Sequence, residues 1–210
     1  MKKVLFIGAH YDDIELGCLG TILKFKKEGY DVRIVVATHS GYSDSLKGHV
    51  RKREDAYQES KVIEDYLQIP FIRLNYDTLA VTVNNWIVEK LIDIINDFSP
   101  DLVFTHHNND INTDHVAVCN ATYIAAKYVP SILMYQVNNY STPQSKELPT
   151  IFINIDDFRA EKTSILKSYV SEASKMSRWI RELEKRSSYY WWIVGCKFAE
   201  GFFTTKFYLC

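Results

Sequence analysis

The chain has 210 residues, 47% of them hydrophobic and 14% aromatic, and a formal net charge of -1 at pH 7. This length and composition predict one globular domain over residues 1–210. The balanced charge argues against nucleic acid as a partner, because such binders usually carry a basic excess. No apolar run reaches the ~18 residues of a membrane span and no export signal is recognisable, so we expect a cytoplasmic protein. The cysteines form no CxxC pair, which predicts isolated thiols.

The first part of the chain has the pattern of a strand, a polar loop and a helix. The apolar run VLFI at residues 4–7 is typical of a central parallel strand, and it ends at Gly8. His10, Asp12 and Asp13 follow directly, at the kind of strand end where ligands bind in open α/β sheets. A histidine and two carboxylates can together hold a divalent metal and accept a proton from water.

The rest of the chain alternates between buried strands and amphipathic helices, which predicts an α/β fold. We expect a single Rossmann-like domain with three α/β/α layers and a mostly parallel sheet. Further strands are expected at 32–38, 70–74, 101–105, 131–136 and 150–155, and helices at 15–28, 47–67, 85–98, 116–127 and 171–188. Asp156 and Asp157 are expected to cap one more helix, whose buried stripe is Ile165, Leu166, Tyr169 and Val170. The aromatic stretch 189–203 is interpreted as core or as an interface between copies in a homo-oligomer.

A second polar cluster, HHNNDINTDH at 106–115, follows the strand expected at 101–105 and leads into a helix. It repeats the pattern of the first cluster, because polar side chains again follow a buried strand. The presence of two such clusters argues against the simpler interpretation, in which HYDD at residues 10–13 is only a polar loop that caps a helix.

These motifs resemble one known family. AHYDDIELG at 9–17 is similar to the AHPDD-type signature of the LmbE-like, or PIG-L-like, zinc-dependent N-deacetylases. The stretch 100–118 resembles the family's strand, loop and closing Asp-His pair, and KFAEGF at 197–202 resembles its closing YAEAF-like motif. Tyr11 replaces the usual proline, a departure that removes no ligand. The resemblance implies the LmbE-like fold and removal of the acetyl group from an N-acetylated amino sugar or its conjugate.

The resemblance also implies a division of roles in the site. His10, Asp13 and His115 would hold the metal, and Asp12 would be the general base. Three protein ligands with open positions are the pattern of a catalytic zinc site, and the same set also accepts Fe²⁺, Co²⁺ or Mn²⁺.

Proton donation and substrate binding are less sharply defined. Asn112 stands where several relatives have a histidine, so we expect it to give a neutral hydrogen bond while His106 or His107 handles protons. Asp110 is a further catalytic candidate, and His107 is also a candidate for substrate binding.

The motif RKRE at 51–54 resembles the family's arginine and glutamate pair on a helix, where the arginine reaches toward the active site. The spacing does not decide between Arg51 and Arg53, and an exposed basic helix face explains the motif equally well. The loops 41–48 and 137–149 are expected to border the substrate.

Two other functional classes remain as alternatives. A nucleotide-binding Rossmann module is disfavoured, because GAHYDDIELG lacks the glycine-rich turn that lets a pyrophosphate approach the backbone. A noncatalytic metal-binding or scaffolding protein differs from the deacetylase in lacking amide hydrolysis. The sequence does not identify the amino sugar.

Overall fold

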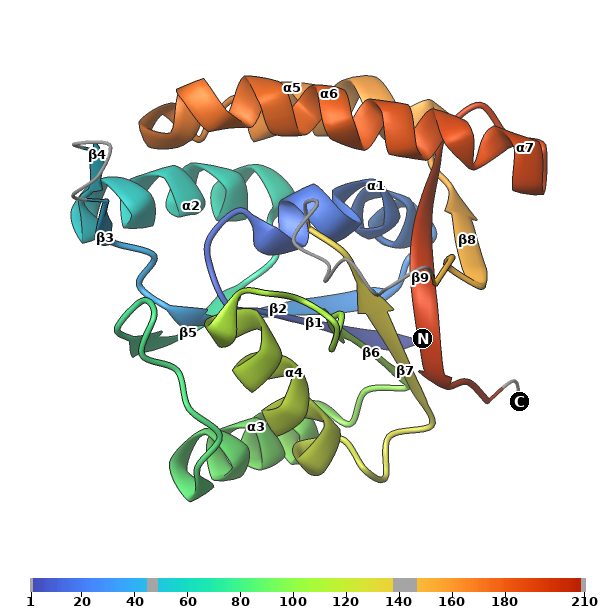
Figure 1. Cartoon of the computed structure of the whole chain (residues 1–210). Coiled ribbons are helices and arrows are strands. Elements are labelled where there is room, and N and C mark those ends of the chain that lie inside the picture. The colour runs from blue at the N-terminus through green and yellow to red at the C-terminus, as the bar shows by residue number, and fades with distance from the viewer. Residues whose placement is uncertain (1, 45–48, 138–146, 209–210) are drawn as a thin grey trace.

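The computed structural model of the protein describes residues 2–44, 49–137 and 147–208. A seven-stranded sheet lies at its centre (Figure 1). Its strands are β1 (Lys3–Gly8), β2 (Asp31–Thr38), β5 (Phe71–Tyr76), β6 (Leu102–His106), β7 (Ser131–Tyr135), β8 (Ile151–Asn154) and β9 (Ala199–Lys206). In space they follow the order β5-β2-β1-β6-β7-β9-β8, and β1 pairs in parallel with both β2 and β6.

The expected mostly parallel α/β sheet is confirmed, with one strand that the sequence did not predict. β9 lies between β7 and β8 and runs antiparallel to both. The aromatic stretch 189–203 therefore divides in two. Its end is a buried strand in which Phe202 and Phe203 are almost inaccessible, whereas Trp191 and Trp192 are exposed.

Helices cover both faces of the sheet (Figure 1). α1 and α2 lie on one face with α5 and α6 outside them, and α3 and α4 lie on the other. None of the helices in the described part of the chain is long and apolar enough to cross a membrane. The bounds are α1 (Asp13–Lys27), α2 (Arg53–Leu67), α3 (Asn85–Phe98), α4 (Thr113–Ala125), α5 (Arg159–Leu166), α6 (Ala173–Tyr189) and α7 (Trp191–Val194).

Two hydrophobic cores lie on the two faces of the sheet because successive strand residues point to opposite sides. Phe6 and Ile34 belong to the core beneath α1 and α2, whereas Leu5 and Val35 belong to the core beneath α3 and α4. Strands buried on both faces read as continuous apolar runs. The runs at the starts of β1 and β2 therefore correctly indicated central strands.

The helix predicted over 47–67 is wrong at its beginning. β3 (Tyr42–Asp44) and β4 (His49–Arg51) form an antiparallel hairpin, and α2 begins only at Arg53. Val50 is exposed and Arg51 is buried, as the two-residue period of a strand requires. The hairpin therefore turns the side chain of Arg51 toward the interior.

Three smaller expectations have three different outcomes. The predicted rim loop 137–149 falls largely, and the loop 41–48 partly, outside the described residues. Cys18, Cys119 and Cys196 are free thiols, as expected. Asp156 was expected to cap a helix, but its carboxylate accepts hydrogen bonds from the backbone of Lys197 and Phe198.

Candidate metal centre

The two polar clusters meet at the carboxyl ends of β1 and β6. These strands are neighbours, and the chain runs outward in opposite directions from them, to β2 on one side and β7 on the other. Such a switch point leaves a crevice between the loops that follow the two strands. The first loop brings His10, Asp12 and Asp13, and the second brings residues 107–112 and the start of α4.

The loop after β1 separates the two adjacent aspartates. Asp12 has a positive φ of 111°, a backbone conformation that few residues other than glycine adopt. Asp13 then begins α1, and its Oδ2 accepts a hydrogen bond from the backbone N–H of His10 at 2.7 Å. The backbone N–H of Tyr11 donates to Ser40 Oγ at 2.7 Å, a bond that a proline at this position could not make.

His10, Asp13 and His115 bring three donor atoms together. His10 Nδ1 lies 3.1 Å from Asp13 Oδ2 and 3.2 Å from His115 Nε2, and His115 Nε2 lies 3.3 Å from Asp13 Oδ2. Atoms bound to one zinc ion at ~2.0–2.1 Å are separated from each other by roughly 3.0–3.4 Å. The three edges of this triangle match that separation.

The outer nitrogen of each histidine contacts a carboxylate. His10 Nε2 lies 2.9 Å from Asp114 Oδ2, and His115 Nδ1 lies 2.8 Å from Asp110 Oδ2. When each outer nitrogen donates its proton to this carboxylate, the inner nitrogen presents a lone pair to the centre of the triangle. Two lone pairs and a carboxylate facing one another form the donor set of a divalent metal site, so the residues fit such a metal.

The electrostatics lead to the same conclusion. Burial disfavours the charged form of both histidines, yet Asp13 and the outer carboxylates raise the pKa of His10 to about 9 and that of His115 to about 10. Burial also opposes ionisation of Asp13, but the neighbouring histidines hold its pKa well below the usual value. The site thus favours positive charge, and a metal that binds there displaces protons.

Asp114 is an important residue of the site that the sequence analysis left without a role. Its buried carboxylate accepts hydrogen bonds from the backbone of Leu79 and Val81 at 2.6 and 3.0 Å, in addition to its contact with His10. It therefore ties the loop before α3 to a metal-binding candidate. Its place in the Asp-His pair at the start of α4 was the available signal.

The two candidate proton-handling histidines lie outside the cavity in front of the triangle. His106 is fully buried, accepts a hydrogen bond from the backbone N–H of Ala9 and stacks on His115 with the ring centroids 4.0 Å apart. Burial lowers its pKa to about 4. His107 accepts from the backbone of Asn109 and packs against Phe203, and burial lowers its pKa also.

A second group of potential ligands, His106, Asp110 and His115, overlaps the triangle. In this group Asp110 binds His115 Nδ1, and the stacked rings of His106 and His115 are almost parallel, at 12°. Parallel stacked rings do not aim their nitrogens at one common point. The His10, Asp13 and His115 group is therefore the better candidate for a metal site, and Asp110 lies behind one of its histidines.

Asp12 lies beside the triangle and contacts Arg51 instead of the histidines. Arg51 Nη1 is 3.3 Å from Asp12 Oδ2, and its other groups reach Glu59 and Ser171. Burial raises the pKa of Asp12 to about 8 although the guanidinium of Arg51 lowers it. Arg53, the other arginine in the motif, is exposed on α2 and lines a different depression together with His39.

A cavity of about 200 Å³ opens in front of the candidate metal site. Its outer wall comes from β3, from the turn η2 (Val170–Glu172) and from α6. The hydroxyl of Tyr42 donates to Glu172 Oε1 at 2.6 Å, and Lys175 Nζ lies 3.1 Å from Glu172 Oε2. No motif pointed to this wall. The cavity is lined by His10, Asp12, Asp13, Ser40, Tyr42, Arg51, Thr78, Leu79, Asn112, His115, Glu172, Lys175 and Trp179.

Asn112 lines the cavity and caps α4. Its Oδ1 accepts hydrogen bonds from the backbone of Asp114 at 2.9 Å and of His115 at 3.4 Å. Because the carbonyl group of the side chain is used in the cap, the amide NH₂ is the part that can donate elsewhere.

Comparison with known proteins supplies the family. The sequence pattern of GlcNAc-PI de-N-acetylase (PIG-L) matches residues 5–126, and both polar clusters lie inside the match. The chain is 31% identical over 179 residues to the "uncharacterized deacetylase YaiS" of Escherichia coli K12, with 81% of this chain and 91% of that protein covered.

Solved structures share the fold at lower sequence identity. One is the N,N'-diacetylchitobiose deacetylase of Pyrococcus horikoshii, with a TM-score of 0.80, 22% identity and coverage of 97% of this chain and 84% of that chain. Another is GalB, a 4-carboxy-2-hydroxymuconate hydratase of Pseudomonas putida KT2440, with a TM-score of 0.84, 17% identity and coverage of 100% and 98%. The fold alone thus leaves the reaction open, but the sequence matches show that the chain is a deacetylase of the PIG-L family.

Proposed function

We propose that the protein hydrolyses the N-acetyl group of an N-acetylated amino sugar or its conjugate, using a divalent metal, with zinc as the first candidate. The observation that carries the proposal is the triangle of donor atoms from His10, Asp13 and His115. The carboxylate of Asp12 lies next to this triangle but is not part of it. The deacetylase relatives and the chitobiose deacetylase of the same fold support an acetylated amino sugar as the substrate class.

His10, Asp13 and His115 would hold the metal, and Asp110 and Asp114 would orient the two histidines. A divalent cation at this place supplies Lewis acidity: it lowers the pKa of water and polarises a carbonyl group. Iron, cobalt and manganese in their divalent states suit the same ligands, so the metal present in the cell depends partly on availability.

Asp12 is the proton carrier in this proposal. Its carboxylate lines the cavity, lies next to the ligands and is held by Arg51. It can take a proton from the attacking water and return it to the leaving amine. His106 and His107 do not line the cavity, whereas Asp12 lines it beside the candidate ligands, so we assign both transfers to Asp12.

Asn112 would stabilise the negative charge that develops on the acetyl oxygen. Its side-chain carbonyl is committed to the α4 cap, so its NH₂ group is available as a hydrogen-bond donor toward the cavity. An amide donates a hydrogen bond but not a proton. The replacement of the usual histidine is therefore consistent with a reaction in which Asn112 is a neutral donor.

Chelator-sensitive acetate release tests the proposal. The metal-loaded protein would be incubated with N-acetylglucosamine, N,N'-diacetylchitobiose, a UDP-linked N-acetyl sugar and N-acetyl glycosides. We expect acetate from at least one of them, no release after treatment with a chelator, and recovery after zinc is added back. Release that persists in the metal-free protein would contradict the metal-dependent mechanism, and bound metal with no release from the whole panel would contradict the substrate class.

A further inference from the structure

An exposed apolar patch lies at α7 (Trp191–Val194), which follows the end of α6 (Figure 1). All four residues of α7, with the sequence WWIV, are exposed, and Trp192 is exposed to 78%. Tyr189, at the end of α6, is exposed as well, and we call Tyr189 and α7 together the α7 patch. A helix that is apolar on every side is normally buried. Contiguous exposed apolar surface is typical of a contact with another protein or with a membrane.

The α7 patch is anchored to the fold. Tyr190, between its two parts, is buried, and its ring packs against the ring of Phe152 in β8 with the centroids 5.0 Å apart. Gly195 ends α7 with a positive φ of 74°, and its N–H donates to the backbone oxygen of Trp191 at 2.8 Å. The patch is therefore part of an ordered helix end, and its exposure follows from the fold.

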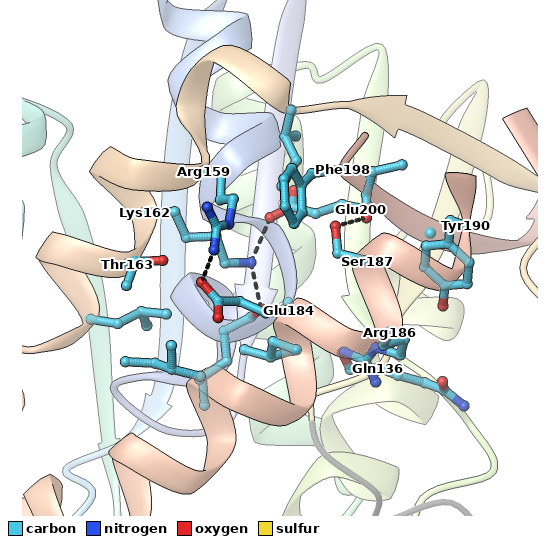
Figure 2. Close-up of a pocket in the computed structure, with 18 residues that line it drawn as sticks. Gln136, Arg159, Lys162, Thr163, Glu184, Arg186, Ser187, Tyr190, Phe198 and Glu200 are labelled. Carbon is cyan, nitrogen blue, oxygen red and sulfur yellow. Dashed lines mark hydrogen bonds and ion pairs between the residues drawn. The ribbon is translucent and has the colours of Figure 1, made fainter. Parts of the chain in front are cut away.

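The inner side of α6 uses its polar side chains within the protein. Figure 2 shows Glu184 paired with Arg159, and Ser187 directed toward β9. Arg159 Nη2 lies 2.8 Å from Glu184 Oε1, and Ser187 Oγ donates to the backbone oxygen of Ala199 at 2.7 Å. The carboxylate of Glu184 is thus engaged by a neighbouring helix.

The outer side of α6 is basic. Its exposed charged residues are Arg178, Arg181 and Lys185, and their spacing of three and four residues places them on one side of the helix. The half-buried Glu182 lies 3.2 Å from Arg178, whereas Arg181 and Lys185 have no ion pair within the described part of the chain. Tyr190 keeps a helical backbone conformation between the two helices, so this basic side leads directly to the α7 patch.

We propose that the α7 patch and the basic side of α6 bind the surface of a membrane that contains anionic phospholipids. Tryptophan is enriched at the boundary between lipid and water, and arginine and lysine are attracted to anionic headgroups. A basic helix with aromatic side chains beside it combines both contributions in one surface. Figure 1 shows α6 on the outside of the molecule, where it can lie flat on a bilayer.

A second copy of the chain fits this surface less well. In a two-fold contact along α6, the basic sides of the two helices would face each other, and the exposed charged residues of α6 include no acid to meet them. An anionic surface instead meets both the basic side and the apolar patch. The proposal does not depend on the reaction at the metal centre, because neither Trp191 nor Trp192 lines the cavity there.

Cosedimentation of the full chain with lipid vesicles tests the proposal. One set of vesicles is made of phosphatidylcholine alone, and the other of phosphatidylcholine and phosphatidylglycerol in equal parts. We expect binding to the anionic vesicles to be at least about tenfold tighter, since three basic side chains act together. Added salt should weaken this binding, because it screens the charges of the exposed residues.

Paired substitutions provide the matched comparison. Trp191→Ser combined with Trp192→Ser removes the aromatic part, and Arg181→Glu combined with Lys185→Glu reverses the basic part. All four side chains are exposed, so we expect folded proteins whose binding to anionic vesicles is at least about tenfold weaker.

Trp86→Ser combined with Lys90→Glu is the control. Both residues are exposed on α3, which covers the opposite face of the sheet, and we expect this variant to bind as the wild type does. Equal binding to the two kinds of vesicle, no binding to either, or an equal loss in the α3 variant would overturn the proposal. Gel filtration adds one more decisive outcome: a dimer that is lost in the Trp191→Ser, Trp192→Ser variant, without vesicle binding by the wild type, would assign the patch to a second copy.

Discussion

The inner and outer parts of the metal-site cavity are built in different ways. The inner part comes from two loops that follow neighbouring parallel strands, and its candidate ligands lie on the first loop or at the start of the helix that follows each loop. The outer wall joins Tyr42 of a hairpin to Glu172 and Lys175 from the last third of the chain. The candidate ligands thus lie where the fold itself brings residues together, whereas the outer wall depends on long-range packing.

Loss of a ligand breaks the inner part and has the largest expected effect. His115→Ala removes one of three donors and leaves Asp110 without its histidine partner. We expect the protein to lose both bound metal and measurable turnover while it stays folded. Metal analysis after gel filtration and an acetate assay check this. A variant that keeps one equivalent of metal would show that His115 is not a ligand.

Asn112 stands at the boundary between the inner part and the open cavity. Asn112→Ala removes the proposed donor to the acetyl oxygen, and such donors contribute about 10²–10³-fold in kcat. It also removes the α4 cap, at a cost of about 1 kcal/mol of stability. Asn112→Asp keeps a capping oxygen and is the control. Equal kcat for Asn112→Ala and wild type would exclude the donor role.

A substitution of Asp114 tests the orientation of a candidate ligand separately from metal binding itself, because Asp114 contacts His10 and is not one of the three candidate ligands. Asp114→Asn keeps the size of the side chain but weakens its hold on His10 and on the backbone of Leu79 and Val81. Metal affinity should fall about 10–100-fold, as is typical for the partners of ligating histidines. Titration with a competing chelator measures it, and activity should return at saturating metal. Unchanged affinity would mean that the Asp114 contact does not support the metal.

The smallest expected effects come from substitutions of the two arginines in the RKRE motif, Arg51 and Arg53. Arg51→Lys loses part of a buried network with Asp12 and Glu59, which should destabilise the protein by about 1–3 kcal/mol and raise KM. Arg53→Lys is the matched control on the exposed surface, and we expect no change in Tm or KM beyond error. Equal effects would contradict the placement of Arg51.

How much of the structure could be predicted from the sequence also differs between the inner part and the outer wall. α3 was predicted at its observed bounds because its apolar residues recur at helical spacing and Ser99-Pro100 ends it. The His and Asp clusters were recognisable because strand ends place them at one edge of the sheet. Local patterns therefore identified the sheet and the two polar clusters, and the resemblance to the family selected the candidate ligands within these clusters.

The failures have physical causes as well. β9 was missed because its pairing partners, β7 and β8, lie far from it in sequence. The choice between Arg51 and Arg53 required the β3–β4 hairpin, whose alternation over three residues is too short to recognise. Glu172 and Trp179 carried no motif, since their position in the cavity depends on how α6 packs outside α1.

The most direct test compares two neighbouring carboxylates of the same type. Metal content and acetate release would be measured for Asp12→Asn and Asp13→Asn, loaded with zinc under identical conditions. The account predicts that Asp12→Asn binds one equivalent of metal but loses turnover, and that Asp13→Asn loses both. Equal metal loss in the two variants, or full activity in Asp12→Asn, would contradict the division into a ligand and a proton carrier.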